Sequence, residues 1–174
     1  MTPTTFYLER PETPIGTLLL LTDAAGRVRV LDFDDYEDRM RRLMRLHYGA
    51  AGYQIDDAPA PTTARRALDA YFAGDIGALD AVEVETGGTP FQRQVWAALR
   101  TIPAGETLSY GELASRIGRP TALRAVGLAN GANPIGVIVP CHRVIGADGS
   151  LTGYGGGLPR KQWLLEHEGA RPAS

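Results

Sequence analysis

The chain has 174 residues, of which 44% are hydrophobic, so it can bury one moderate core or two small ones. The longest apolar stretches, 15–21 and 135–139, are too short to span a bilayer, and no signal-peptide pattern precedes them, so we expect a cytoplasmic protein with no membrane partner. One cysteine and three histidines exclude an internal disulfide framework and a zinc cluster, so we predict no metal site.

The formal net charge of -2 hides an asymmetry between the two halves of the chain. Residues 1–86 hold 9 arginines against 15 acidic residues, a charge of -6. Residues 87–174 hold 9 basic residues against 5 acidic ones, a charge of +4. A polyanion such as nucleic acid should therefore prefer the second half, although a difference of this size is weak evidence by itself.

The first 86 residues have the pattern of a small α/β domain. Three strand-like runs are separated by turn-forming residues: 6–8, 17–22 and 28–33. They predict a small antiparallel sheet of three strands. Apolar residues at helical spacing around Met44 and around Leu68 predict two helices that cover this sheet. For Met44 and His47, packing in or beside the core is a better explanation than chemistry.

The glycine pair at 87–88 is the best candidate for a boundary between two domains, 1–86 and 87–174. Thr89 directly follows it, with Pro90 next in the chain and Gln92 three positions on. These are an N-cap, a proline in the first turn and a capping-box partner. A helix is therefore predicted to begin here and to end before the Pro-Ala-Gly turn at 103–105.

Two further helices are predicted after that turn. Ser109 and Glu112 form a second capping box, and a Gly-Arg-Pro break at 118–120 separates this helix from a helical pattern over 121–131. Two short helices joined in this way have the shape of a helix-turn-helix, although any helical hairpin gives the same pattern. The second helix carries small side chains with Arg124 as its long exposed residue, which would let its backbone approach a narrow groove. Tight packing against a neighbouring helix explains the small side chains equally well.

The only cysteine, Cys141, follows the apolar run 135–139 and Pro140 and precedes His142 and Arg143. A thiol of ordinary pKa, about 8.5, is mostly protonated at neutral pH, and neighbouring cations or a positioned base raise its thiolate fraction. A lone cysteine is more often an inert core residue, but the adjacent His142 and the preceding Asn133 favour a reactive one. The same Cys, His and Asn set equally suggests a cysteine protease.

The segment 138–146, Ile-Val-Pro-Cys-His-Arg-Val-Ile-Gly, resembles the active-site signature of the O6-alkylguanine-DNA alkyltransferases, the methylated-DNA–protein-cysteine methyltransferases. Further residues match that family in order and spacing: Phe91-Gln92, Val95-Trp96, Ile102-Pro103, Gly105, Ser109-Tyr110, 124–127, Asn133-Pro134, 153–157, 163–165 and Glu168-Gly169. The resemblance is strong over 87–169, whereas residues 1–86 resemble only the looser N-terminal domain of the bacterial members.

The resemblance implies a mixed α/β fold. A ribonuclease-H-like N-terminal domain with a small antiparallel sheet would occupy 1–86. A mostly helical, winged-helix-like domain containing the helix-turn-helix would occupy 87–174 and carry both DNA binding and catalysis. Some relatives hold a structural zinc in the first domain, but this chain lacks the cysteines for one, and no cofactor is implied.

The resemblance also assigns catalytic roles. Cys141 would accept the alkyl group, and His142 would relay its proton through a water to Glu168. Tyr110 would hydrogen-bond the guanine ring and donate a proton as the dealkylated base leaves. Asn133 resembles the hinge residue between the recognition helix and the cysteine loop.

DNA and base contacts follow from the same resemblance. Arg124 would enter the stack through the minor groove and fill the gap left by the flipped nucleotide. The other expected DNA contacts are Ser109, Tyr110, Thr121, Ala125, Gly127 and Gly131. The expected pocket residues are Asn133, Val144, Tyr154 and Gly155.

The implied function is DNA repair by direct reversal of damage. An O6-alkylated guanine, with O4-alkylthymine as a candidate second substrate, would be flipped out of duplex DNA and would give its alkyl group irreversibly to Cys141. A thioether has no good leaving group, so each molecule should act once. We expect a monomer on double-stranded DNA, with cooperative binding left open. The alternatives are a lesion-binding protein without catalysis and a cysteine hydrolase.

Overall fold

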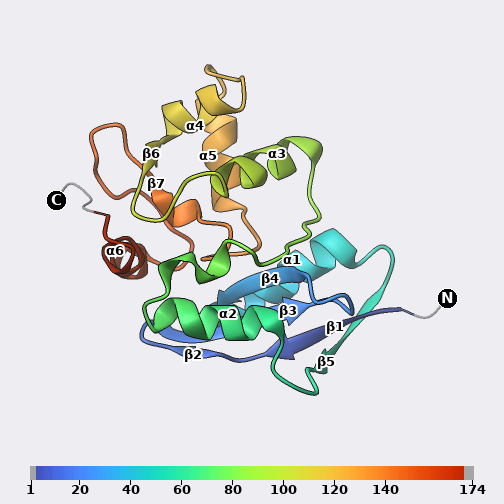
Figure 1. Cartoon of the computed structure of the whole chain (residues 1–174). Helices are drawn as coiled ribbons and strands as arrows, with labels where there is room; N and C mark the ends of the chain where they lie inside the picture. The colour runs from blue at the N-terminus through green and yellow to red at the C-terminus, as the bar shows by residue number, and fades with distance from the viewer. Residues whose placement is uncertain (1–2, 171–174) are drawn as a thin grey trace. The chain divides into compact units, whose positions relative to one another are not determined.

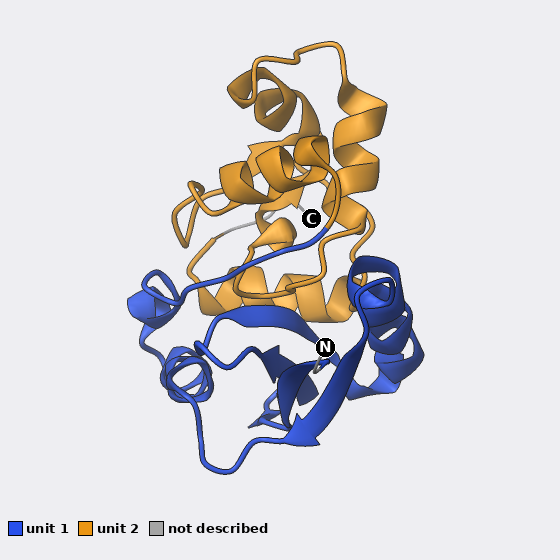
Figure 2. Cartoon of the chain, turned by 90° about the vertical axis from the view of Figure 1, so that its right-hand side faces the viewer, with its two compact units in different colours: residues 1–87 blue, residues 88–174 orange. Residues whose placement is uncertain are grey.

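The computed structural model describes residues 3–170 and divides the chain into two compact units, Met1–Gly87 and Gly88–Ser174 (Figure 1 and Figure 2). The last residues of the predicted second domain, 171–174, lie outside the described residues. None of the helices within 3–170 is long and apolar enough to cross a membrane.

The first unit is built on a five-stranded mixed sheet. Its strands are β1 (Thr4–Glu9), β2 (Glu12–Thr13), β3 (Gly16–Thr22), β4 (Val28–Phe33) and β5 (Tyr53–Asp57). Strand β3 pairs antiparallel with β1, β2 and β4, so the three strands expected from the sequence are confirmed. The expectation of a purely antiparallel, three-stranded sheet is wrong, because β2 extends the sheet and β5 joins β1 in parallel.

The helices of the first unit cover the apolar residues of this sheet. They are α1 (Glu37–Tyr48) and α2 (Thr63–Phe72), which confirms the two predicted helices. Met40 and Met44 of α1 pack into one core cluster with Leu19 and Leu21 of β3. Residues two apart share a face of a strand, so the neighbouring leucines at 18 and 20 lie on the other face. All four leucines are 0% exposed, so both faces of β3 are covered.

The second unit is mostly helical. Its elements are α3 (Pro90–Leu99), β6 (Leu108–Ser109), α4 (Tyr110–Arg116), α5 (Leu123–Gly131), η3 (Cys141–Arg143), β7 (Val144–Ile145) and α6 (Leu158–His167). Both predicted capping boxes are present: Thr89 with Gln92 begins α3, and Ser109 with Glu112 begins α4. The third predicted helix begins at Leu123, two residues later than the pattern indicated.

The three helices α3, α4 and α5 pack on one another around an apolar core. Trp96 of α3 is 2% exposed and its indole nitrogen donates to the carbonyl oxygen of Ala129 at 2.8 Å, which ties α3 to α5. The mixed α/β character expected from the sequence is therefore confirmed, with a sheet in the N-terminal unit and helices in the C-terminal one. The ribonuclease-H-like and winged-helix-like descriptions stay predictions.

Candidate active site and nucleic-acid interface

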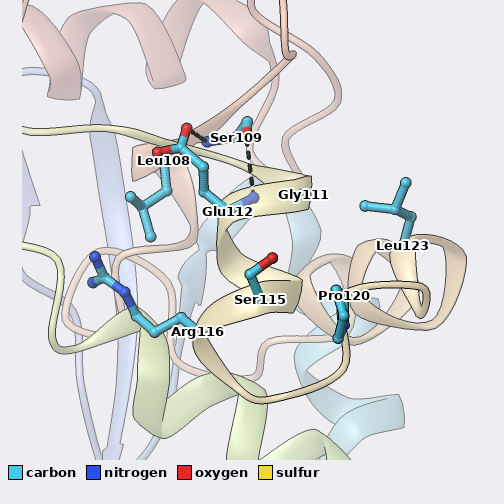
Figure 3. Close-up of a pocket in the computed structure, with 8 residues that line it drawn as sticks. All are labelled: Leu108, Ser109, Gly111, Glu112, Ser115, Arg116, Pro120 and Leu123. Atoms are coloured by element: carbon cyan, nitrogen blue, oxygen red, sulfur yellow. Dashed lines mark hydrogen bonds between the residues drawn. The ribbon is translucent and has the colours of Figure 1, made fainter.

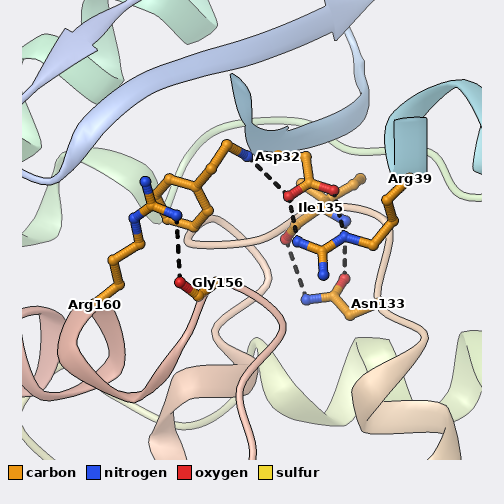
Figure 4. A network of polar contacts seen from close by, with 7 residues as sticks. Asp32, Arg39, Asn133, Ile135, Gly156 and Arg160 are labelled. Atoms are coloured by element: carbon orange, nitrogen blue, oxygen red, sulfur yellow. Dashed lines mark hydrogen bonds and ion pairs between the residues drawn. The ribbon is translucent and has the colours of Figure 1, made fainter. Parts of the chain in front are cut away.

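Cys141 is the first residue of the short helical turn η3 and is 9% exposed. The segment before it is held by Asn133. Its side-chain nitrogen donates to the carbonyl of Ile135 at 3.2 Å (Figure 4) and to that of Val139 at 2.8 Å. Val137 within this segment has a φ of 67°, an unfavourable conformation for a β-branched residue. The hydrogen bonds of Asn133 thus fix a strained backbone that leads from the end of α5 to the thiol.

His142, Arg143 and Glu168 form a buried network next to the thiol. The Nε2 atom of His142 lies 2.9 Å from Oε2 of Glu168. Arg143 donates to both carboxylate oxygens of Glu168 at 2.9 Å and to the carbonyl of Ile102 at 2.6 Å. The expectation that a water lies between His142 and Glu168 is wrong, because the two side chains are already at hydrogen-bond distance.

The charges of this network follow from burial and pairing. Burial alone would raise the pKa of Glu168, but hydrogen bonds and charge from His142 and Arg143 hold it well below its ordinary value. Burial lowers the pKa of His142, and Glu168 offsets only part of this effect. Glu168 is therefore ionised and His142 neutral near neutral pH, although Glu168 caps the C-terminus of α6, where an anion is otherwise unfavourable.

The protonation of the imidazole ring follows from these states. An ionised carboxylate can only accept, so Nε2 of His142 must carry the hydrogen that it donates to Glu168. The other ring nitrogen, Nδ1, then has its lone pair available. It is buried and has no hydrogen-bond partner among the described residues. His142 is thus prepared to act as a base through Nδ1.

Tyr110 and the expected pocket residues come together through pairing that joins distant parts of the second unit. Strand β6 pairs with β7, which places Leu108 opposite Val144 and Ser109 opposite Ile145. Tyr110 follows directly, and its hydroxyl oxygen accepts a hydrogen bond from the hydroxyl of Thr152 at 3.2 Å.

The ring of Tyr154 meets the ring of His142 edge-on, with centroids 6.5 Å apart. The expected pocket residue Gly155 comes next in the chain and is exposed. Tyr154 therefore contacts the histidine that follows the thiol in the chain, and Thr152 links the same loop to Tyr110.

The exposed face of α5 carries most of the expected DNA contacts. Thr121, Arg124, Ala125 and Gly131 are exposed, whereas Gly127 is half-buried. Among the described residues beyond the adjoining turns of α5, a Cβ added at Gly131 would meet no atom within 4 Å, and one at Gly127 would meet only the ring of Tyr110, at 3.9 Å. Packing within the chain therefore does not require a glycine at either position.

Comparisons with known proteins show which family this chain belongs to. A family model for "6-O-methylguanine DNA methyltransferase, DNA binding domain" matches residues 90–170. The methylated-DNA–protein-cysteine methyltransferase of Salmonella typhimurium is 52% identical over 161 residues, which are 92% of this chain and 94% of that protein. The chain belongs to the methylated-DNA–protein-cysteine methyltransferase family. The family predicted from the active-site signature is thus confirmed.

Solved structures of the methyltransferase family agree with this identification. The crystal structure of Mycobacterium tuberculosis OGT in complex with DNA has a TM-score of 0.74 and 45% identity, covering 95% of this chain and 92% of that one. An O6-methylguanine-DNA methyltransferase from the archaeon Pyrococcus kodakaraensis has a TM-score of 0.66 and 28% identity, covering 95% and 99%. The similarity therefore extends over both compact units.

Several residues of this methyltransferase site were not found from the sequence. Arg143 was noted only as a neighbouring cation, yet it is the residue that clamps Glu168. Lys161 of α6 is 0% exposed and was not considered. Leu128, which was also missed, is 69% exposed on α5 one turn after Arg124, so Arg124 is not the only long side chain on that surface. The position of Arg143 inside the signature 138–146 was the available signal for that residue, and Lys161, the single lysine of the chain, lies outside the matching segments.

A surface depression lies beside the predicted helix-turn-helix of this methyltransferase and does not include the thiol (Figure 3). Its lining residues come from α4, the strand before it and the region leading into α5: Leu108, Ser109, Gly111, Glu112, Ser115, Arg116, Pro120 and Leu123. The expected DNA contact Ser109 thus lines this depression. Its hydroxyl accepts from the backbone N–H of Glu112, and its own N–H donates to the Glu112 carboxylate, which together form the α4 capping box. Within residues 3–170, no group of three or more histidine, cysteine, aspartate or glutamate side chains is arranged so that it could hold a metal ion.

Proposed function

We propose that the protein repairs DNA by moving the methyl group of O6-methylguanine onto Cys141, once per molecule. Membership in the family supports the reaction, and the chain has a single cysteine that can accept the group. The observation that carries the proposal is the position of this cysteine directly before the buried His142–Glu168 pair. The wider substrate class of O6-alkylguanines, with O4-alkylthymine as a candidate, is part of the same proposal.

His142 supplies the base for this reaction. Its Nδ1 atom takes the thiol proton of Cys141, and Glu168 stabilises the imidazolium that forms. Arg143 keeps Glu168 ionised and correctly turned. The sulfur then forms a bond to the methyl carbon while the carbon–oxygen bond breaks, and its electron pair passes to O6 of the guanine.

Tyr110 lowers the charge on the departing guanine by donating a proton from its hydroxyl to the ring. These steps leave His142 as an imidazolium and Tyr110 as a phenolate. One proton then passes from His142 through solvent to Tyr110, so the net change is one proton moved from the sulfur of Cys141 to the base. The thioether that remains has no leaving group that the described site could activate, and the protein is consumed. Thr152 positions the Tyr110 hydroxyl through its hydrogen bond, and Val144, Tyr154 and Gly155 form the wall of the base pocket together with Asn133.

Double-stranded DNA carrying the lesion is the proposed partner, approached by α5 through the minor groove. The empty space above Gly131 favours close approach of an external backbone over packing inside the protein. Arg124 enters the stack and occupies the gap left by the flipped base. Leu128, one turn further on, contacts the sugars with its apolar side chain. Ser109, Thr121, Ala125 and Gly127 contribute the remaining contacts, and the protein acts as a monomer.

Intact-protein mass spectrometry after mixing with duplex DNA that contains O6-methylguanine tests the reaction. The wild-type chain should gain one methyl group per molecule, and Cys141→Ala should gain none. Tight binding of the modified duplex without any mass change would instead identify a lesion-binding protein. Repeated turnover of a substrate would contradict the single-use mechanism.

A further inference from the structure

Val137 is the one residue other than glycine that has a positive φ among residues 3–170, at 67°. A β-branched side chain is rare in this conformation, because its branches crowd the backbone. Gly136 stands directly before it and could take a positive φ without strain, yet it does not. The reaction steps described above do not use Val137, so the strain on this valine calls for an explanation.

The backbone at Val137 forms a tight turn. The N–H of Ile138 donates to the carbonyl oxygen of Gly136 at 2.7 Å, a hydrogen bond across a single residue. With a positive φ at its centre, this is the rare and strained form of the γ-turn. A second bond, from the N–H of Val139 to the carbonyl oxygen of Ile135 at 3.1 Å, encloses it. The chain therefore folds back on itself within residues 135–139.

The strained γ-turn is linked to the thiol through one carbonyl group. The carbonyl oxygen of Val139 accepts from the N–H of Cys141 at 2.8 Å and from Nδ2 of Asn133, also at 2.8 Å. The bond from Cys141 closes a second γ-turn, of the common kind, at Pro140, whose φ is -82° and ψ is 65°. The turn at Val137 thus sets the Val139 carbonyl, which in turn holds the backbone of the nucleophile.

The side chain of Val137 keeps the turn from relaxing. It is 1% exposed, so a rotation of the backbone to a negative φ would move an apolar group out of its closely packed site. The hydrogen bonds from Asn133 to the carbonyls of Ile135 and Val139 hold both ends of the turn at the same time. Strained backbone persists only where its surroundings over-determine it, and such places are concentrated at functional sites.

We propose that Val137 is a positioning residue for methyl transfer, which fixes the direction of the Cys141 thiol by combining a strained turn with a buried, branched side chain. This proposal rests on the proposed function of the site. Displacement at the methyl carbon requires the sulfur to lie in line with the carbon–oxygen bond that breaks, and a misplacement of about 1 Å can slow a reaction about a hundredfold. A glycine at 137 would accept the turn but would also accept many other conformations. The valine therefore exchanges stability for a single arrangement of the nucleophile.

Two truncations separate the backbone conformation from the loss of the side chain. Val137→Gly and Val137→Ala both empty the same buried space, but only glycine takes a positive φ without strain. Val137→Gly should therefore melt about 3 °C higher than Val137→Ala. Val95, 0% exposed on α3, is the matched control, because Val95→Gly should melt lower than Val95→Ala in an ordinary helix. The same order at both positions would contradict the strain.

Methyl transfer should follow the opposite order at position 137. On folded protein, Val137→Gly should react with the O6-methylguanine duplex about tenfold more slowly than the wild type. It should also be slower than Val137→Ala, although it is the more stable of the two. Alkylation of Cys141 by iodoacetamide, a small reagent that the protein does not orient, should stay within about twofold of the wild type in both variants. Val137→Ile, which keeps the branched side chain, and Val95→Gly should transfer at the wild-type rate.

NMR on the unaltered protein tests the turn even if a variant does not fold. A positive φ brings the amide proton and the Hα proton of a residue close together, so the nuclear Overhauser effect between these two protons of Val137 should be strong. The amide proton of Cys141 should exchange slowly with solvent, because it is bonded to Val139. A weak Overhauser effect at Val137 overturns the proposal.

The outcomes distinguish this inference from the proposed function. If the wild-type chain gains no methyl group from DNA, the proposed function fails, whereas the melting order and the Overhauser effect still test the turn. If methyl transfer occurs but Val137→Gly has the wild-type rate, the turn serves only the fold and the present proposal is overturned. Equal losses in methyl transfer and in iodoacetamide alkylation also contradict it, because the substitution would then act on the reactivity of the thiol and not on its direction.

Discussion

The two compact units bury charged groups in different ways. In the first unit, the buried Asp32 pairs with Arg39 at 2.6 Å (Figure 4), but the arginine side chain is 27% exposed and so keeps contact with water. In the second unit, the side chains of His142 and Glu168 are both 0% exposed. Removing such groups from water is costly, and apolar side chains would fill the same volume at less cost. A fully buried ionic cluster is therefore a mark of chemistry rather than of stability.

The largest expected effect is from Arg143→Met, which leaves Glu168 and His142 buried without their cation. Breaking a buried ion pair by removing one partner costs about 3–5 kcal/mol of unfolding free energy. Chemical denaturation monitored by circular dichroism measures it, with Arg116→Met as the control, since Arg116 is exposed. If Arg143→Met loses no more unfolding free energy than Arg116→Met, the buried charge of Glu168 does not depend on Arg143 for its stabilisation.

Leu19→Ala in the first unit should cost about 3 kcal/mol, because it leaves a cavity in the core cluster of β3 and α1. The same measurement applies, and Leu46→Ala is the matched control, because Leu46 is 75% exposed. The rate of methyl transfer by the folded fraction should not change. If methyl transfer were slower at a temperature where the variant is fully folded, the core of the first unit would affect the chemistry, and the contrast between the two units would not hold.

Acid should affect the second unit through Glu168. Its pKa is lowered by folding from the ordinary 4.5, so the unfolded chain takes up a proton first and unfolding becomes easier as the pH falls through 4.5. The melting temperature should fall less steeply with acid in Glu168→Gln than in the wild type, while Glu166→Gln, an exposed neighbour, keeps the wild-type slope. Equal slopes in all three proteins would remove Glu168 as the acid-sensitive group.

Arg124→Ala should slow repair of duplex DNA by about tenfold or more, while the reaction with the free base O6-methylguanine stays at the wild-type rate. Only the duplex requires a base to be extruded and its place in the stack filled. Arg45→Ala, an exposed arginine on α1, serves as the control for the loss of one positive charge. Equal losses in both reactions of Arg124→Ala would mean that Arg124 does not fill the gap left by the flipped base.

The smallest effect is expected for Gly131→Gln, a change of surface shape alone. No atom of the described residues outside the adjoining turns of α5 lies within 4 Å of the added Cβ, so the melting temperature should hardly change. Repair of duplex DNA should be about threefold slower, because the longer side chain keeps α5 away from a narrow groove. Ala97→Gln, at an exposed position of α3, is the control. Unchanged repair by Gly131→Gln would mean that α5 does not approach DNA closely there.

Local patterns in the sequence determined much of the second unit. The capping boxes at Thr89 and Ser109 depend on neighbouring residues only, so they predict where α3 and α4 begin without knowledge of the rest. The family signature around Cys141 likewise indicated the reactive residue. The main strands of the first unit were also predicted, since alternating or continuous apolar runs need only their own residues to be recognised.

The tertiary structure decided what depends on residues far apart in the chain. Strand β5 has two acidic residues and lies at an edge of the sheet, so its own pattern is weak and only its pairing with β1 defines it. The pairing of β6 with β7 joins residues 36 positions apart, and no local rule gives such a contact. The direct His142–Glu168 contact and the burial of Lys161 are of the same kind. Sequence determined which groups could take part in the chemistry, whereas long-range packing determined their distances and which of them lost contact with water.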